Sequence, residues 1–242
     1  MCGIVGILNK NKPVEYQQLK KMADAIHYRG PDDEGHYLNQ NLGFYHKRLS
    51  IIDPEMGKQP METERYCIVF NGEIYNYIEL RDELKSKGHQ FKTNSDTEVI
   101  IRLYEEYGHE SIHLLNGMFA FLLYDKPREQ LIAARDHFGI KPLYFYINDN
   151  KWIFASEIKA ILQHSEVDAE VNRESLADYL TFQFILGEDT LFKNIKKFEP
   201  GTYMVLNLNS FCHHTVKYWS PNFSVDKFHT EEYFKYHLRK LV

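Results

Sequence analysis

The sequence contains little cysteine, no long apolar run and no excess of positive charge. The three cysteines, Cys2, Cys67 and Cys212, lie too far apart for a metal or redox motif. No stretch approaches the roughly 18 uncharged apolar residues of a membrane span. The N-terminus lacks the basic region, apolar core and cleavage site of a secretory signal. We therefore expect a protein of the reducing cytoplasm, without a membrane segment.

The charge balance gives no reason to expect binding to nucleic acid or to an anionic membrane, because the net charge is −5. The 242 residues, 43% hydrophobic and 26% charged, suit one large globular domain or one domain with a fragment of another. No metal site is expected. The pair His213 and His214 falls on a predicted strand, where neighbouring side chains point to opposite faces.

Short apolar strands and blocks of helix follow one another without a regular alternation, which predicts an α+β fold. We expect two antiparallel sheets with helices outside them. Strands are predicted at 3–8, 35–38, 42–46, 66–70, 119–125, 131–136, 143–147, 152–156, 202–208 and 213–219. Helices are predicted around 19–26, at 76–88, 95–108, 157–163, 173–182 and 230–242. Asn76 with Glu79, and Ser95 with Glu98, have the spacing of a capping box.

Cys2 stands directly before the first apolar strand. Removal of Met1 would give this residue both a thiol and a free α-amine. A thiol near pKa 8.5 needs a base at neutral pH, and an α-amine with a pKa of about 7.7–8.0 can serve as that base. The alternative is that a cysteine near the start of a chain has no role.

Asn71 and Gly72 follow the apolar strand predicted at 66–70. An Asn side-chain N–H beside a Gly main-chain N–H at a strand end can form an oxyanion hole. A plain turn is the alternative interpretation, since Asn-Gly is a common hairpin signal. The residues that follow favour a helix start over a paired strand.

Two charged residues suit the two ends of a free amino acid. Arg48 precedes the apolar run 49–52, and its guanidinium can hold a carboxylate through two parallel bonds. Asp96 lies in the first turn of a predicted helix, where the helix dipole favours the ionised carboxylate. The alternatives are a surface arginine and a capping aspartate. With the thiol and the donors, these charges describe a pocket for an amino acid with a side-chain acyl group.

A series of eight motifs makes a family resemblance specific. They are 2–4 (CGI), 29–32 (RGPD), 48–51 (RLSI), 71–76 (NGEIYN), 95–98 (SDTE), 117–121 (GMFAF), 135–144 (RDHFGIKPLY) and 155–160 (ASEIKA). In this order they resemble the N-terminal glutaminase domain of glutamine-hydrolysing asparagine synthetases. That domain is a class II glutamine amidotransferase of the N-terminal-nucleophile hydrolases.

The resemblance implies a four-layer αββα sandwich of two antiparallel sheets flanked by helices. It also implies the site residues. Cys2 is the nucleophile and its α-amine the base, while Asn71 and Gly72 form the oxyanion hole. The residues implied to bind the substrate are Arg48, Leu49, Ser50, Ile51, Ile52, Asn71, Gly72, Glu73 and Asp96.

The function implied is hydrolysis of the glutamine side-chain amide to glutamate and ammonia through a Cys2 thioester. The ammonia supplies asparagine synthesis in a C-terminal domain that uses ATP and magnesium. Residues 2–219 are expected to form the amidotransferase domain, and 220–242 a linker and the first helix of that further domain. No cofactor is implied for this chain. The partners implied are L-glutamine, the C-terminal domain and a second subunit in a homodimer.

Two alternatives stay open. If Met1 is retained, Cys2 lacks its base and the chain is an inactive glutamine-binding module. The ammonia acceptor is another carboxylate if the chain comes from a related amidating enzyme. Arg135, Asp136 and Lys141 are interpreted as parts of a contact with the further domain or of an ion-pair network.

Overall fold

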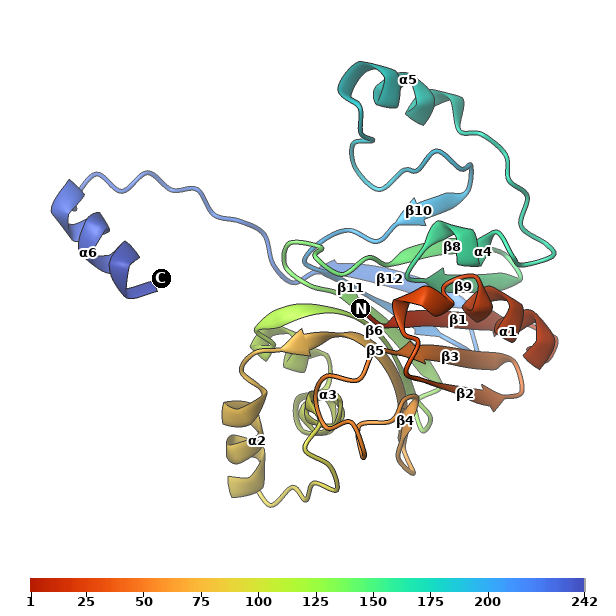
Figure 1. Ribbon diagram of the computed structural model, residues 1–242, viewed down its shortest axis with the longest axis horizontal. Helices are drawn as coiled ribbons and strands as arrows, with labels where there is room; N and C mark the ends of the chain where they lie inside the picture. The colour runs from red at the N-terminus through yellow and green to blue at the C-terminus, as the bar shows by residue number, and fades with distance from the viewer. Residues whose placement is uncertain (242) are drawn as a thin grey trace.

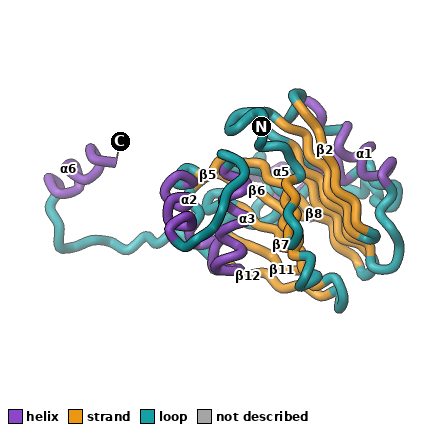
Figure 2. The backbone as a smooth tube through the Cα atoms, turned by 90° about the horizontal axis from the view of Figure 1, so that it is seen from below, coloured by secondary structure: helices purple, strands orange, loops and turns teal. Residues whose placement is uncertain are grey.

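Two antiparallel sheets of six strands each form the centre of the structure, a computed structural model that describes residues 1–241. The first sheet has the order β10-β8-β9-β1-β3-β2, and the second has the order β12-β11-β7-β6-β5-β4. Figure 1 shows the arrangement, and Figure 2 shows the sheets from a second side as stacked layers. The strands are β1 (Gly3–Asn9), β2 (Asp33–Asn39), β3 (Leu42–Arg48), β4 (Met61–Glu62), β5 (Tyr66–Ile74), β6 (Gly117–Asp125), β7 (Gln130–Arg135), β8 (Tyr144–Asn148), β9 (Lys151–Ala155), β10 (Ile195–Lys197), β11 (Thr202–Asn207) and β12 (Cys212–Lys217).

Helices cover the outer face of each sheet. On the first sheet, α1 (Tyr16–Asp24) and α4 (Ile158–Ile161) pack over β1, β3 and β9. The second sheet is covered by α2 (Tyr77–Ser86), α3 (Asp96–Tyr107) and the 3-10 helix η2 (Gly108–Leu114). A short 3-10 helix, η1 (His27–Arg29), follows α1. The layers therefore run helix, sheet, sheet, helix, which confirms the predicted αββα sandwich.

The alternation of side chains in β1 explains why this strand is apolar throughout. Ile4 and Leu8 lie in the core between the sheets, whereas Val5 and Ile7 lie under α1 in the same core as Leu19. Successive side chains of a strand point to opposite faces. Because both faces of β1 are covered, no position in it is available for a polar residue that faces water.

Most predicted elements occur near their predicted positions. The sequence gives no sign of β4, β10 and the helices η1 and η2. The strands β4 and β10 have two and three residues, too few to show a periodicity.

The predicted capping box at Asn76 is wrong, and of the one at Ser95 only the serine bond is present. Asn76 makes no cap bond to α2, because its side chain donates to the Leu114 carbonyl and accepts from the Asn116 amide. Ser95 does cap α3, since its hydroxyl accepts from the Thr97 amide at 3.2 Å. Glu98 does not return to Ser95 but binds the preceding turn.

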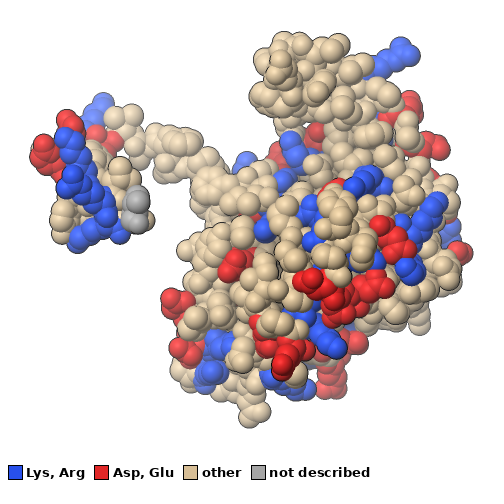
Figure 3. All heavy atoms as spheres, in the orientation of Figure 1, with Lys and Arg blue, Asp and Glu red and all other residues tan. Residues whose placement is uncertain are grey.

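Two helices project from the sandwich. In Figure 1, α5 (Arg173–Phe182) stands above the sheets, and α6 (Glu231–Leu241) lies apart beyond an extended segment. Figure 3 shows charges of both signs scattered over the body, whereas the end that bears α5 is mostly uncharged. No residue of α6 is buried, and Val242 of the predicted last helix lies outside the described residues. Within residues 1–241, no helix combines the length and the apolar character that crossing a membrane requires.

Candidate active site

A cavity of about 240 Å³ opens where the start of β1, the end of β3 and the later half of β5 meet. Of the ten predicted site residues, nine line it: Cys2, Arg48, Leu49, Ile51, Ile52, Asn71, Gly72, Glu73 and Asp96. Ser50 does not, since it lies beside the cavity and its amide donates to the Asp32 carboxylate at 2.8 Å. The structure thus brings together residues from distant parts of the sequence.

The lining also includes residues that sequence analysis did not assign to the site: Met1, Gly57, Gln59, Phe70, Ser95, Thr97, Met118 and Lys141. Ser95, Thr97, Met118 and Lys141 belong to the motifs that carry the resemblance, so those motifs contained a signal for them. Gln59 stands in an irregular loop, where no spacing pattern marks it.

The main chain around Cys2 is fixed from several sides. Strand β1 lies between β3 and β9, and Ile4 exchanges two bonds of 3.0 Å with buried Ser156. The guanidinium of Arg29 donates to the Cys2 carbonyl at 2.9 Å and pairs with Glu157 at 2.7 Å. The apolar start of the chain therefore anchors this terminus, as predicted.

The Cys2 thiol contacts the main chain of Leu49. The Leu49 amide donates to Sγ at 3.4 Å, and Sγ lies 3.6 Å from the Leu49 carbonyl. Burial raises the pKa of this thiol, and the Leu49 amide opposes that shift. Burial lowers the pKa of the N-terminal amine. The thiol therefore needs a base. The N-terminal amine near it can serve, because its lowered pKa favours the neutral form. In the full sequence this amine belongs to Met1, and after removal of Met1 it would belong to Cys2.

The position predicted for Asn71 and Gly72 is corrected by the structure. They do not follow the end of a strand, because β5 continues to Ile74 and pairs with β6 throughout, with Gly72 opposite Phe119. The turn interpretation is therefore wrong as well. Cys67 and Val69 of β5 face the core between the sheets, so Asn71 faces the same side as the start of β1.

Both candidate oxyanion donors are available. The Nδ2 atom of Asn71 is buried and has no hydrogen-bond partner among the described residues. Along β5 the Phe70 amide donates to the Gln59 side chain at 2.6 Å, and the Ile74 amide donates to Asp96 at 3.1 Å. These two amides point away from β6, and alternate residues of a strand share a direction. The Gly72 amide between them therefore also points to the open edge of β5.

Gly72 is required by its surroundings. A Cβ atom there would lie 2.3 Å from the Met118 carbonyl oxygen and 2.8 Å from the Phe119 Cα atom. Both contacts are to main chain of the paired strand, which cannot rotate away. Any larger residue would separate β5 from β6 at the point where the Gly72 amide faces the cavity.

Arg48 holds the loop that forms one side of the cavity. Its guanidinium donates to the Pro54 carbonyl at 2.7 Å and to the Asp53 carbonyl at 2.8 Å. A guanidinium has five N–H donors, so others remain for a ligand. Arg48 is buried and lines the cavity, and its predicted bidentate bond to a carboxylate stays a prediction.

Asp96 lies at the start of α3, as predicted, but its pKa follows burial instead of the helix dipole. Burial raises the pKa of Asp96 to about 6, and the charge of Glu73 adds to this shift although main-chain amides oppose it. The carboxylate is still the main form at pH 7. Its affinity for a cation is therefore sensitive to mild acid.

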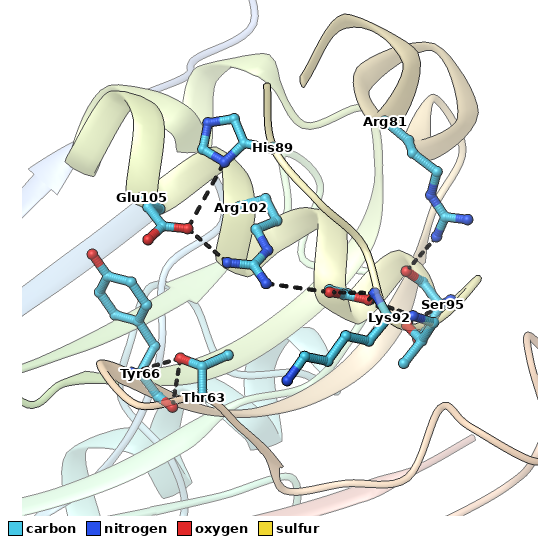
Figure 4. A network of polar contacts seen from close by, with 10 residues as sticks. Thr63, Tyr66, Arg81, His89, Lys92, Ser95, Arg102 and Glu105 are labelled. Carbon is cyan, nitrogen blue, oxygen red and sulfur yellow. Dashed lines mark hydrogen bonds and ion pairs between the residues drawn. The ribbon is translucent and has the colours of Figure 1, made fainter. Parts of the chain in front are cut away.

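A polar network holds the start of α3 in place (Figure 4). Arg81 donates to the Ser95 carbonyl at 2.9 Å. Buried Glu98 accepts from the amides of Lys92 and Thr93 and lies 3.5 Å from Arg102. These bonds fix the turn before α3 and with it the position of Asp96.

The cavity combines a thiol, an amine, two free N–H donors, a guanidinium and two carboxylates. Such a set can bind a zwitterion by its charged ends and transfer an acyl group to sulfur. Among residues 1–241, no three His, Cys, Asp or Glu side chains gather as a metal site would require.

Comparisons with known proteins agree with this description. A family model described as "Glutamine amidotransferase domain" matches residues 1–219. An asparagine synthetase (glutamine-hydrolysing) 1 of Bacillus subtilis is 46% identical over 212 residues, which cover 85% of this chain and 33% of that protein. A homologue in Arabidopsis thaliana, asparagine synthetase (glutamine-hydrolysing) 2, is 44% identical over 172 residues, covering 69% and 29%. The chain thus spans about a third of the length of these relatives.

A solved structure supports the fold. The glutamine phosphoribosylpyrophosphate amidotransferase of B. subtilis aligns with a TM-score of 0.64 at 18% identity, covering 91% of this chain and 50% of that one. Because the family model matches residues 1–219, this chain belongs to the glutamine amidotransferase domain family.

Proposed function

We propose that this chain hydrolyses the side-chain amide of glutamine to glutamate and ammonia, with Cys2 as nucleophile. The observation that carries the proposal is the placement of two unpartnered donors, Asn71 Nδ2 and the Gly72 amide, on the cavity that contains Cys2. A buried amide nitrogen without a partner is costly unless a ligand supplies the acceptor. A tetrahedral oxyanion is such an acceptor.

The reaction proceeds in two acyl transfers. The α-amine takes the thiol proton, and the sulfur bonds to the amide carbon while the carbonyl electron pair moves to oxygen. Asn71 and Gly72 hold that oxyanion. The resulting ammonium returns its proton to the amide nitrogen, the C–N bond breaks and ammonia leaves. Water, deprotonated by the amine, then cleaves the thioester to release glutamate and restore the thiol.

The two ends of glutamine are held by opposite charges. Arg48 supplies N–H donors for the α-carboxylate, and Glu73 and Asp96 accept from the α-ammonium. All three line the cavity that contains Cys2. Leu49, Ile51 and Ile52 complete the wall beside the substrate.

The ammonia is proposed to serve asparagine synthesis in a further domain. The relatives named above are asparagine synthetases about two and a half times as long as this chain. ATP and magnesium would act in that further domain, and no step of the hydrolysis uses them. The proposed setting is the cytoplasm, which is supported by three cysteines that all carry free thiols.

The test is glutamate release from glutamine by the purified chain, with the mass of the intact chain measured in parallel. Loss of Met1 and release of glutamate that Cys2→Ala abolishes are expected. Cys212→Ser is the matched control, because Cys212 is exposed and lies on β12. Activity in Cys2→Ala equal to that of the natural chain would refute the mechanism.

A binding module without turnover is the second candidate, because a Met1 that is not removed lies in the cavity lining and leaves Cys2 without a free α-amine. Retained Met1 together with glutamine binding but no glutamate release would establish it. Asparagine formation from aspartate, ATP and glutamine, tested with the full-length protein, separates aspartate from other acceptors.

A further inference from the structure

Lys141 is a buried cation with no partner for its charge. Its residue is 6% exposed, and it lines the cavity that contains Cys2. Among residues 1–241, no carboxylate lies within 4.0 Å of its ammonium and no hydrogen bond to it is found, so the predicted ion-pair network is wrong for this side chain. The Nζ atom is not among the enclosed polar atoms that lack a partner, so the ammonium opens to the cavity while the rest of the side chain is buried. Partial burial lowers the pKa of Lys141, and a cation held in this way without a counter-charge is typical of a functional site.

The loop before Lys141 is built around two buried side chains. The Asp136 carboxylate accepts from the amides of Phe138, Ile140 and Lys141 at 2.9 to 3.1 Å. Arg135 donates to the carbonyls of Lys141 at 2.8 Å and Gly139 at 2.7 Å. The amide and the carbonyl of Lys141 are therefore both hydrogen-bonded, which fixes the position of its main chain and of the base of its side chain.

The same loop is joined to β6, the strand that pairs with the strand carrying the oxyanion donors. The Asp136 amide donates to the Phe119 carbonyl at 2.8 Å, and the Asp136 carboxylate accepts from the Phe119 amide at 3.0 Å. Phe119 lies opposite Gly72 in the β5–β6 pair. Lys141 and the oxyanion donors therefore share one rigid frame.

The two arginines near Cys2 are held in place by bonds to main-chain carbonyls or to a carboxylate. Arg48 donates to loop carbonyls, and Arg29 donates to the Cys2 carbonyl and pairs with Glu157. Burial raises the pKa of the Cys2 thiol, and the Leu49 amide, the N-terminal amine, Arg48 and Lys141 oppose that shift, in decreasing order. Burial lowers the pKa of the N-terminal amine, and the charges of Arg29 and Lys141 lower it further. The Cys2 charge opposes the lowering of the Lys141 pKa by burial. The charged and titratable groups that face Cys2 are the N-terminal amine, Arg29, Asp32, Arg48, Glu73, Asp96 and Lys141.

We propose that Lys141 is a positioning residue whose ammonium stabilises the Cys2 thiolate and keeps the neighbouring amine neutral. This inference deepens the glutaminase function proposed above and rests on it for its catalytic meaning. Lys141 exchanges no proton in the step: the thiol proton passes to the amine, and Lys141 supplies positive charge beside the sulfur. The charge of Glu73 in turn favours the protonated form of Lys141.

The test measures the thiol itself, without glutamine. Lys141→Met keeps the length of the stem and removes the charge, whereas Lys141→Arg keeps the charge. Both are made with Cys212→Ser, so that the exposed thiol does not react. The rate of Cys2 alkylation by iodoacetamide is followed by peptide mass spectrometry from pH 6 to 10. Buried Cys67 serves as an internal control for unfolding.

In Lys141→Met, the alkylation profile should shift to higher pH, with a rate at pH 7 about tenfold lower for a shift of one pKa unit. Lys141→Arg should keep the natural profile. An unchanged profile in folded Lys141→Met, or an equal shift in Lys141→Arg, would overturn the proposal. If Lys141→Met does not fold, Lys141→Gln takes its place.

The outcome is independent of the proposed glutaminase activity. A natural chain that releases no glutamate, but whose thiol profile shifts in Lys141→Met, would contradict the enzyme and support the role of Lys141. Glutamate release by the natural chain, with an unshifted thiol profile in Lys141→Met, would support the enzyme and contradict the role of Lys141.

Discussion

At the scale of the residue, Asn71 can act as an oxyanion donor because its side-chain N–H groups are not used within residues 1–241 of the protein. Its Nδ2 atom is buried and unpartnered. We expect Asn71→Ala to lower kcat for glutamate release by about 10²–10³-fold, because one oxyanion donor contributes roughly 2.7–4 kcal/mol to the barrier. The thermal midpoint should stay near that of the natural chain, since no bond within the protein is lost. A large loss of stability would show that the side chain is structural.

Asp96 should make glutamine binding sensitive to pH. The pKa of Asp96 is raised to about 6, so its carboxylate gains a proton as the pH falls through that value. The affinity for the α-ammonium is therefore present above pH 6 and is lost below it. The dissociation constant of glutamine for Cys2→Ala should rise about tenfold between pH 7.5 and pH 5.

Calorimetry with Cys2→Ala avoids thiol chemistry in that measurement. The matched control adds Asp96→Asn, which should bind weakly with no change over the same pH range. A constant affinity in Cys2→Ala would show that Asp96 does not contact the ammonium.

The sequence indicated these residues by type and motif, but not their geometry. It placed Asn71 and Gly72 after a strand, because the apolar run ends at Phe70 and the residues that follow favour a helix start. The pairing with β6 that makes them part of β5 joins them to residues 49 and 47 positions further along the chain, and no local pattern encodes it. The raised pKa of Asp96 likewise depends on burial by other segments, which the helix spacing does not show.

At the scale of the element, the start of α3 depends on Glu98 more than on a capping box. Its buried carboxylate accepts from the Lys92 and Thr93 amides and from the Thr93 hydroxyl at 2.7 to 3.0 Å. Glu98→Ala would leave those donors without a partner and should lower the free energy of unfolding by about 2–3 kcal/mol. The Michaelis constant for glutamine should rise too, because Asp96 is on the same turn.

Chemical denaturation checks the stability effect. Glu110→Ala is the control, since that side chain is 81% exposed and its loss should change stability by no more than about 0.5 kcal/mol. Equal effects of the two substitutions would show that Glu98 does not organise the turn.

The capping signals show why element ends are harder to predict than element cores. Apolar spacing located α1 and α3 because burial selects it along the whole element. A cap is one hydrogen bond, and a competing acceptor or donor can replace it. Asn76 binds Leu114 and Asn116 instead of α2, and these partners are brought near by the tertiary fold.

At the scale of the whole molecule, alternation and apolar runs predicted the class of fold but not the order of strands. Strand β1 could be recognised as buried on both faces, yet nothing in its seven residues states that β3 and β9 are its neighbours. The four-layer arrangement followed from the motifs that carry the family resemblance.

The boundary of the domain provides the last prediction. Residues 220–241 are exposed throughout, and α6 buries no side chain. A chain ending at Trp219 should therefore keep the thermal midpoint and the glutamate release of the 242-residue chain.

The control is a chain that ends two residues earlier. Tyr218 is buried and donates to the Arg135 carbonyl at 2.8 Å, while Trp219 packs edge-on against His137 and Phe138. Loss of a buried aromatic residue costs about 3–5 kcal/mol, so ending at Lys217 should lower the thermal midpoint clearly. It should also loosen the loop from Arg135 to Lys141 and slow the reaction of Cys2. If both truncations are equally stable, the sandwich ends before Tyr218; if both are destabilised, α6 belongs to it.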